Sequence, residues 1–93
     1  RTLLGSSLDE QTLRLEVEFL TDSLEALRHE GAISNDAYLD AGTIQGGLAM
    51  VANLAALDVD KSELIDHMQQ LAVRADRIEA AHPGLDDAIA SKR

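Results

Sequence analysis

The stretch LRLEVEFLTDSLEALRHEG, residues 13–31, places large apolar side chains three and four positions apart and ends on Gly31. The recurring residues are Leu13, Val17, Leu20, Leu24 and Leu27. Residues at this spacing share one face of an α-helix, and glycine adopts the left-handed conformation that ends many helices. Ser7 and Glu10 have the spacing of a capping box. The pattern predicts a first helix over residues 8–30.

A second helix is predicted from a cap at Ser34 or Asn35 to about Leu57. One stripe comprises Ala37, Ala41, Ile44, Leu48, Val51 and Ala55, and the opposite side carries Leu39, Met50, Leu54 and Leu57. Because it is apolar nearly all round, this helix should be central. Gly42, Gly46 and Gly47 each cost about 1 kcal/mol relative to alanine, so a break there is the alternative to a continuous helix.

A third helix is predicted after a second capping box, Asp60 with Glu63. Its apolar stripe comprises Leu64, Met68, Leu71, Ala75 and Ile78, and it stops at Pro83 and Gly84. A short terminal helix can follow. Strand patterns are nearly absent, so we predict an all-α fold: a small bundle of three helices with antiparallel neighbours, with or without the short fourth helix. Residues 1–7 are expected to form a flexible lead-in and residues 8–93 a single helical domain.

The first helix has a second apolar face, formed by Leu8, Leu15, Phe19 and Ala26 on the side opposite the main stripe. A three-helix bundle buries one face of each helix, so this second face needs a cover. The terminal helix can fold back over it, or the lead-in can pack there through Leu3 and Leu4. Otherwise a second copy or another protein covers it.

For the last of these cases, the predicted protein-interaction residues are anchors inside a polar rim. The anchors are Leu8, Leu15 and Phe19, and the rim comprises Glu16, Glu18, Asp22 and Glu25. We also expect a homodimer through the first or second helix, because both have more apolar surface than one small monomer can bury.

The net charge of −9, from 17 acidic and 8 basic residues, disfavours direct binding of nucleic acid or an anionic membrane. No apolar run is long enough to span a membrane. Cysteine is absent, which excludes thiolate metal sites and thiol nucleophiles. His29, His67 and His82 each follow a glutamate by one helical turn, which favours surface ion pairing. We therefore expect no metal, no cofactor, no catalytic residues and no enzymatic activity.

Acidic residues concentrate in the first helix, where they outnumber Arg14 and Arg28. A solvated face that keeps an apolar helix soluble is one explanation. Complementarity to a basic partner, including mimicry of DNA, is the other.

A short, acidic, all-helical chain with a two-faced helix over residues 13–31 resembles the small antiactivators of LuxR-type quorum-sensing regulators, the QslA-like antiactivators. The resemblance covers size, acidity and helical layout, and no motif carries a functional residue across. It implies a dimeric protein that binds the ligand-binding domain of a transcription regulator and blocks the regulator's dimerisation or DNA binding. Separately, we expect a cytoplasmic location. Two alternatives remain open: a secretion-type chaperone or assembly subunit for a client protein, and an acidic DNA-mimic inhibitor.

Overall fold

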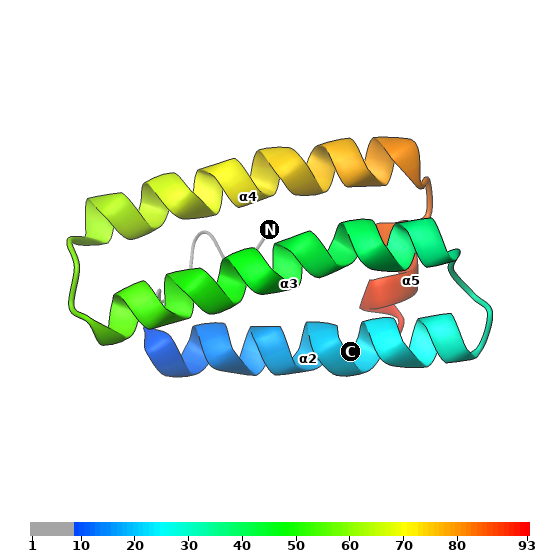
Figure 1. The fold of residues 1–93 in the computed structure, drawn as a ribbon, viewed down its shortest axis with the longest axis horizontal. Helices are drawn as coiled ribbons and strands as arrows, with labels where there is room; N and C mark the ends of the chain where they lie inside the picture. Colours follow the sequence, from blue (N-terminus) through cyan, green and yellow to red (C-terminus); the bar gives the residue numbers. More distant parts are fainter. Residues whose placement is uncertain (1–8) are drawn as a thin grey trace.

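The structure, a computed structural model, describes residues 9–93, which form four helices and no strand. Three long helices, α2 (Glu10–His29), α3 (Asn35–Ala56) and α4 (Lys61–Ala81), run antiparallel to their neighbours, and the short α5 (Leu85–Ala90) folds back behind them (Figure 1). The chain is therefore an all-α small bundle, as the sequence predicts. The lead-in proposed for residues 1–7 lies outside the described residues.

The start of α2 corrects the predicted capping box. Asp9, not Ser7, precedes the first helical residue, and its carboxylate accepts a hydrogen bond of 2.7 Å from the Thr12 amide. Ser7 itself lies outside the described residues. The end of α2 matches the prediction, since Gly31 adopts φ +75° and the Ala32 amide bonds to the Leu27 carbonyl.

The central helix α3 is continuous, so the alternative break at its glycines is wrong. Ser34 caps it as predicted, with its hydroxyl oxygen 3.0 Å from the Ala37 amide. One glycine has a packing reason. A Cβ atom on Gly47 would lie 2.3 Å from a methyl carbon of Leu71, so α3 and α4 approach each other closely there.

The start of α4 lies where the sequence places it, but the predicted capping box does not form. The Asp60 side chain accepts no capping hydrogen bond. Instead, the Glu63 amide donates to the backbone carbonyl of Asp60 at 3.0 Å. That bond uses the amide which a capping side chain would otherwise satisfy.

The predicted stripes form the core. The four leucines of the α2 stripe are buried, and so are Leu64, Met68 and Leu71 of the α4 stripe. They pack on the inner side of α3, whose Leu48, Val51 and Ala52 are buried. Helix α3 contacts both α2 and α4, whereas α2 and α4 lie on opposite sides of it (Figure 1). This layout buries one side of α3 and leaves its opposite side exposed.

Candidate protein-interaction site

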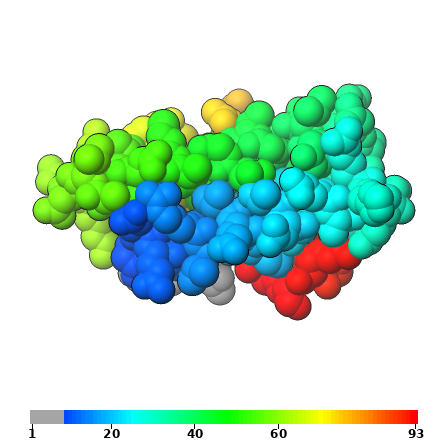
Figure 2. Space-filling model, turned by 60° about the horizontal axis from the view of Figure 1, so that its bottom comes forward, coloured from blue at the N-terminus to red at the C-terminus, as the bar shows by residue number. Residues whose placement is uncertain are grey.

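The C-terminal segment covers Phe19, one of the two predicted anchors on α2. The Arg93 guanidinium lies over the Phe19 ring, 4.1 Å from its centroid, and forms an ion pair with Glu16. Lys92 reaches Glu30 at 2.7 Å. Figure 2 shows this segment lying against α2. For Phe19, the structure therefore has the alternative in which the terminal helix folds back.

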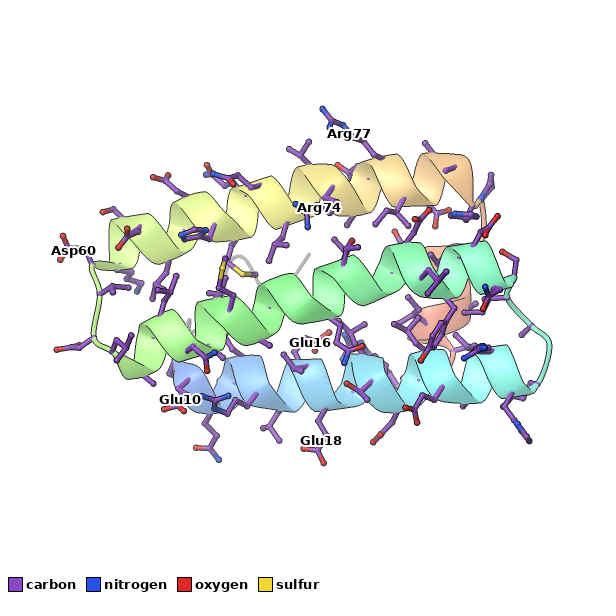
Figure 3. The ribbon with its side chains drawn as sticks, in the orientation of Figure 1. Glu10, Glu16, Glu18, Asp60, Arg74 and Arg77 are labelled. Carbon is purple, nitrogen blue, oxygen red and sulfur yellow. The ribbon has the colours of Figure 1, made fainter. Side chains whose placement is uncertain are left out.

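Leu15 remains in water. Its side chain is 59% exposed, one of the most exposed large apolar side chains on the described chain. Glu18, Asp22 and Glu25 follow it on the same side of α2 and are exposed. None of these three forms an ion pair with any residue in the range 9–93. Figure 3 shows Glu18 extending away from the bundle. We call Leu15, Glu18, Asp22 and Glu25 the α2 outer face.

The predicted set of interaction residues is thus divided. Leu15 and three rim acids share an exposed surface, whereas Phe19 and Glu16 are partly buried beside the C-terminal segment. Leu8 lies outside the described residues. The sequence did contain a sign that the C-terminal segment would cover part of α2. Lys92 and Arg93 are cations that pair with carboxylates, and α2 is the most acidic of the described helices.

A second surface lies along the central helix. Leu39, Met50 and Leu57 are 59%, 46% and 74% exposed, and a Cβ added to Gly42 or Gly46 would meet no atom within 4 Å. We call these five residues the α3 outer face. Residues 41–57 carry no charge. A glycine inside a helix costs about 1 kcal/mol of stability relative to alanine. Close packing within the described chain accounts for glycine at position 47 but not at positions 42 and 46.

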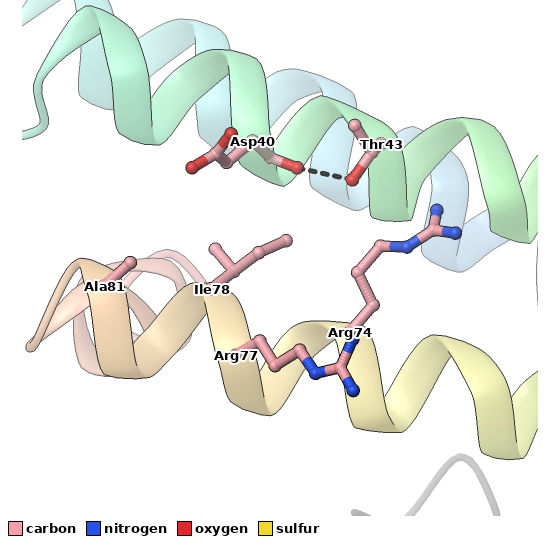
Figure 4. A pocket seen from close by; sticks show the side chains of 6 residues that line it. All are labelled: Asp40, Thr43, Arg74, Arg77, Ile78 and Ala81. Carbon is pink, nitrogen blue, oxygen red and sulfur yellow. Dashed lines mark hydrogen bonds between the residues drawn. The ribbon is translucent and has the colours of Figure 1, made fainter.

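Arginines flank the α3 outer face on both sides. From α2, Arg14 bonds to the Asn53 side chain at 3.1 Å, and the Arg28 guanidinium lies 4.7 Å from the Tyr38 ring centroid. From α4, Arg74 and Arg77 line a shallow pocket of about 360 Å³ together with Asp40 and Thr43 of α3 (Figure 4). Neither Arg74 nor Arg77 forms an ion pair with a described residue. A strongly acidic chain thus gathers positive charge beside its central helix.

A cleft of about 690 Å³ lies between α2 and α4 on the side covered by α5. Core residues such as Leu20, Leu48 and Met68 line it, and Arg93 and Glu16 stand at its α5 end. The lining is largely aliphatic, and its polar and charged members are Thr12, Glu16, Asp86, Asp87 and Arg93.

The ion pairs predicted for the histidines are not found among the described residues for His29 and His67, which form none with Glu25 and Glu63. His82 pairs with Asp40 of α3, with 2.8 Å between Nε2 and Oδ2, instead of with Glu79. The Glu79 carboxylate accepts backbone hydrogen bonds from Gly84 and Asp86 at the start of α5. Over residues 9–93 no three His, Asp or Glu side chains are grouped as metal ligands. In the same range, no helix combines the length and the apolar character needed to cross a membrane.

Comparison with known proteins adds no functional assignment. No protein-family profile matches the chain. No curated protein and no solved structure is significantly similar to it. The function is therefore argued from the two exposed faces.

Proposed function

We propose that the chain is a non-enzymatic protein-interaction module, a homodimeric inhibitor that binds a transcription regulator and keeps it from acting. The observation that supports this proposal is the α2 outer face, where Leu15 stands 59% exposed among carboxylates that have no partner among the described residues. A large apolar side chain inside a polar ring is the usual anatomy of an interface anchor.

The charge of this face indicates the kind of partner. Glu18, Asp22 and Glu25 repel nucleic acid and attract a basic protein surface, which raises the association rate and selects the partner. A regulator that binds DNA carries such basic surface. Occupying it, or the regulator's own dimer contact, would prevent DNA binding.

The homodimer is proposed for a separate reason. The α3 outer face exposes three large apolar residues that the bundle does not cover. Apolar residues that share one uncharged side of a helix suit a contact with a second apolar helix face. A second copy on α3 would leave Leu15, Glu18 and Asp22 of the α2 outer face available for the regulator.

The alternative functions are weighed by the same geometry. A DNA mimic needs a long row of free carboxylates. The α2 outer face offers Glu18, Asp22 and Glu25, but Glu10, Glu16 and Glu30 of the same helix region form ion pairs within the chain, which shortens the row. A secretion-type chaperone needs a client to cover its core-forming faces, whereas the α2 stripe here is buried by the chain's own helices. Both observations favour the inhibitor.

The test is a binding assay with a matched pair of variants. The immobilised chain is used to capture partners from its own cell lysate at 0.05 and 0.5 M salt, and each captured protein is identified by mass spectrometry. A captured regulator is then purified and its DNA binding is measured by mobility shift with and without the chain. Leu15→Ala should abolish capture and inhibition. Val73→Ala, which truncates an apolar residue on α4 that is 52% exposed, should leave both intact.

Three results would overturn the proposal. Capture that is unaffected by Leu15→Ala would place the contact elsewhere. A captured regulator that binds DNA normally in the presence of the chain would remove the inhibitory role. Capture that disappears entirely at 0.5 M salt would favour DNA mimicry, because an apolar anchor keeps its contribution at high salt whereas exposed charge pairs are screened.

A further inference from the structure

The central helix presents a surface that its own neighbours do not use. The α3 outer face follows about 27 Å of helix from Leu39 to Leu57, at 1.5 Å per residue. The charged residue nearest to its middle is Asp40, which pairs with His82 on the α4 side of the helix. The face is therefore uncharged along its centre in a chain whose net charge is −9.

The contacts that α3 makes with α2 and α4 show which charged residues of these two helices lie at the same height along α3. On the α2 side, Arg28 lies against Tyr38. Glu25, one turn before Arg28 on α2, therefore stands beside residues 41 and 42 of the antiparallel α3. On the α4 side, Arg74 and Arg77 lie beside Asp40 and Thr43, at the same level of α3.

We propose that two copies of this chain associate through the α3 outer face, with the two α3 helices parallel and a two-fold axis running along them. The proposal rests on the homodimer of the proposed function and names its surface. A rotation of 180° about such an axis does not shift α3 along its length, so each residue of α3 lies opposite the same residue of the second copy. The same rotation places α2 of one copy against α4 of the other. Glu25 of each copy then faces Arg74 and Arg77 of the second copy, and symmetry forms this contact twice.

Two further features suit this occupant. Arg28 of one copy comes to the level of Asp36 on the other, so a second pair of opposite charges meets on the same flank. At the centre, Gly42 and Gly46 leave open space above the backbone, so that the second α3 helix can approach closely. In an antiparallel dimer, α2 would lie against the second α2 and α4 against the second α4. Arg74 and Arg77 would then lie over the second α4, away from Glu25.

The absence of cysteine from the sequence makes the arrangement directly testable by cross-linking. Gly42→Cys and Met50→Cys each place a thiol within the contact, at two positions about 12 Å apart along the helix. In the parallel dimer each position faces its own equivalent. Each variant alone should therefore form a covalent dimer on mild oxidation at micromolar concentration. Gln69→Cys, on an exposed position of α4, should remain monomeric in the same gel.

Charge exchange provides a second readout. Glu25→Arg should raise the dimer dissociation constant at least tenfold in analytical ultracentrifugation. Combining it with Arg74→Glu and Arg77→Glu should restore the dimer, because the contact is re-formed with its signs exchanged. Glu18→Arg makes the same change in net charge two turns away and should not weaken the dimer.

Other outcomes overturn the proposal. A chain that stays monomeric at 0.5 mM has no such contact. Covalent dimers that form only when Gly42→Cys and Met50→Cys are mixed show an antiparallel arrangement, and efficient self-cross-linking of Leu15→Cys shows a dimer through α2. The proposed inhibitory function is tested separately, since Leu15→Ala reports on regulator capture and leaves the α3 outer face intact.

Discussion

The Arg93 guanidinium covers the ring of Phe19 at 4.1 Å from its centroid while it pairs with Glu16. One side chain near the C-terminal end thus holds two residues of α2, and α5 contacts α2 beside it. Cation–π contact and ion pairing together hold the C-terminal segment over this partly buried ring.

Arg93→Ala should therefore lower the free energy of unfolding by about 1 kcal/mol, as exposed cation–π and ion-pair contacts usually do. Arg93→Lys should lose most of the stacking and keep part of the ion pair. A double-mutant cycle with Phe19→Ala, followed by urea denaturation, should give a coupling energy of about 0.5–1 kcal/mol. In the same assay, Phe19→Ala should cost less than Leu20→Ala, a core truncation worth about 2–5 kcal/mol. A coupling energy of zero would mean that Arg93 does not hold Phe19 in solution.

The position of α5 depends on Glu79. Its carboxylate accepts hydrogen bonds of 2.8 Å from the amides of Gly84 and Asp86, which satisfies free amides at the start of this six-residue helix. Glu79→Ala should cost about 1–2 kcal/mol, the usual range for losing a cap. Amide hydrogen exchange should show faster exchange in Leu85–Ala90, with α3 unaffected. Asp76→Asn, at an exposed position of α4, is the control; equal effects from both variants would refute the capping role.

The fold could be predicted from the sequence because its determinants are local. Apolar residues three and four positions apart decide which face of each helix is buried. Gly31 and Ser34 end and begin helices through contacts within a few residues. Where prediction failed, two local groups competed for one amide. At Asp60 the backbone carbonyl accepts the bond that the side chain was expected to accept.

The candidate site was harder to predict because its decisive contacts are distant in sequence. Leu15 and Phe19 are four residues apart and share a side of the helix by periodicity alone. They differ because Phe19 packs against the edge of the core and is covered by Arg93, which lies 77 residues beyond Glu16. The arginines beside α3 were likewise hidden, since Arg28 and Arg74 belong to different helices and only packing sets them along the same one. Helical periodicity describes each helix and not its neighbours.

Gly46 and Gly47 are adjacent in sequence but should respond oppositely to alanine. A Cβ at Gly47 would lie 2.3 Å from the Leu71 side chain, which is buried, so overpacking of about 1–3 kcal/mol should outweigh the gain in helix propensity. A Cβ at Gly46 meets nothing within 4 Å, and Gly46→Ala should stabilise the monomer by up to about 1 kcal/mol. Urea denaturation at the lowest usable protein concentration measures both. Equal stabilisation by the two variants would show that α3 and α4 do not approach closely at Gly47.

Glu18 offers a test of how the α2 outer face recognises its partner. The side chain extends from the bundle and forms no ion pair with the described residues, so Glu18→Lys should change the free energy of unfolding by less than about 0.5 kcal/mol. Its effect should appear in the encounter with a basic partner. The association rate constant should fall about two- to tenfold at low salt, with little change in the dissociation rate constant.

Surface plasmon resonance with the captured regulator measures both rate constants, and raising the salt should reduce the difference between variant and parent as the charges are screened. Glu63→Lys makes the same change in charge on an exposed position of α4 and serves as the control. If the control slows association equally, only the net charge of the chain matters. If Glu18→Lys instead raises the dissociation rate constant alone, the residue contacts the partner directly, and its place in a solvated rim around Leu15 is wrong.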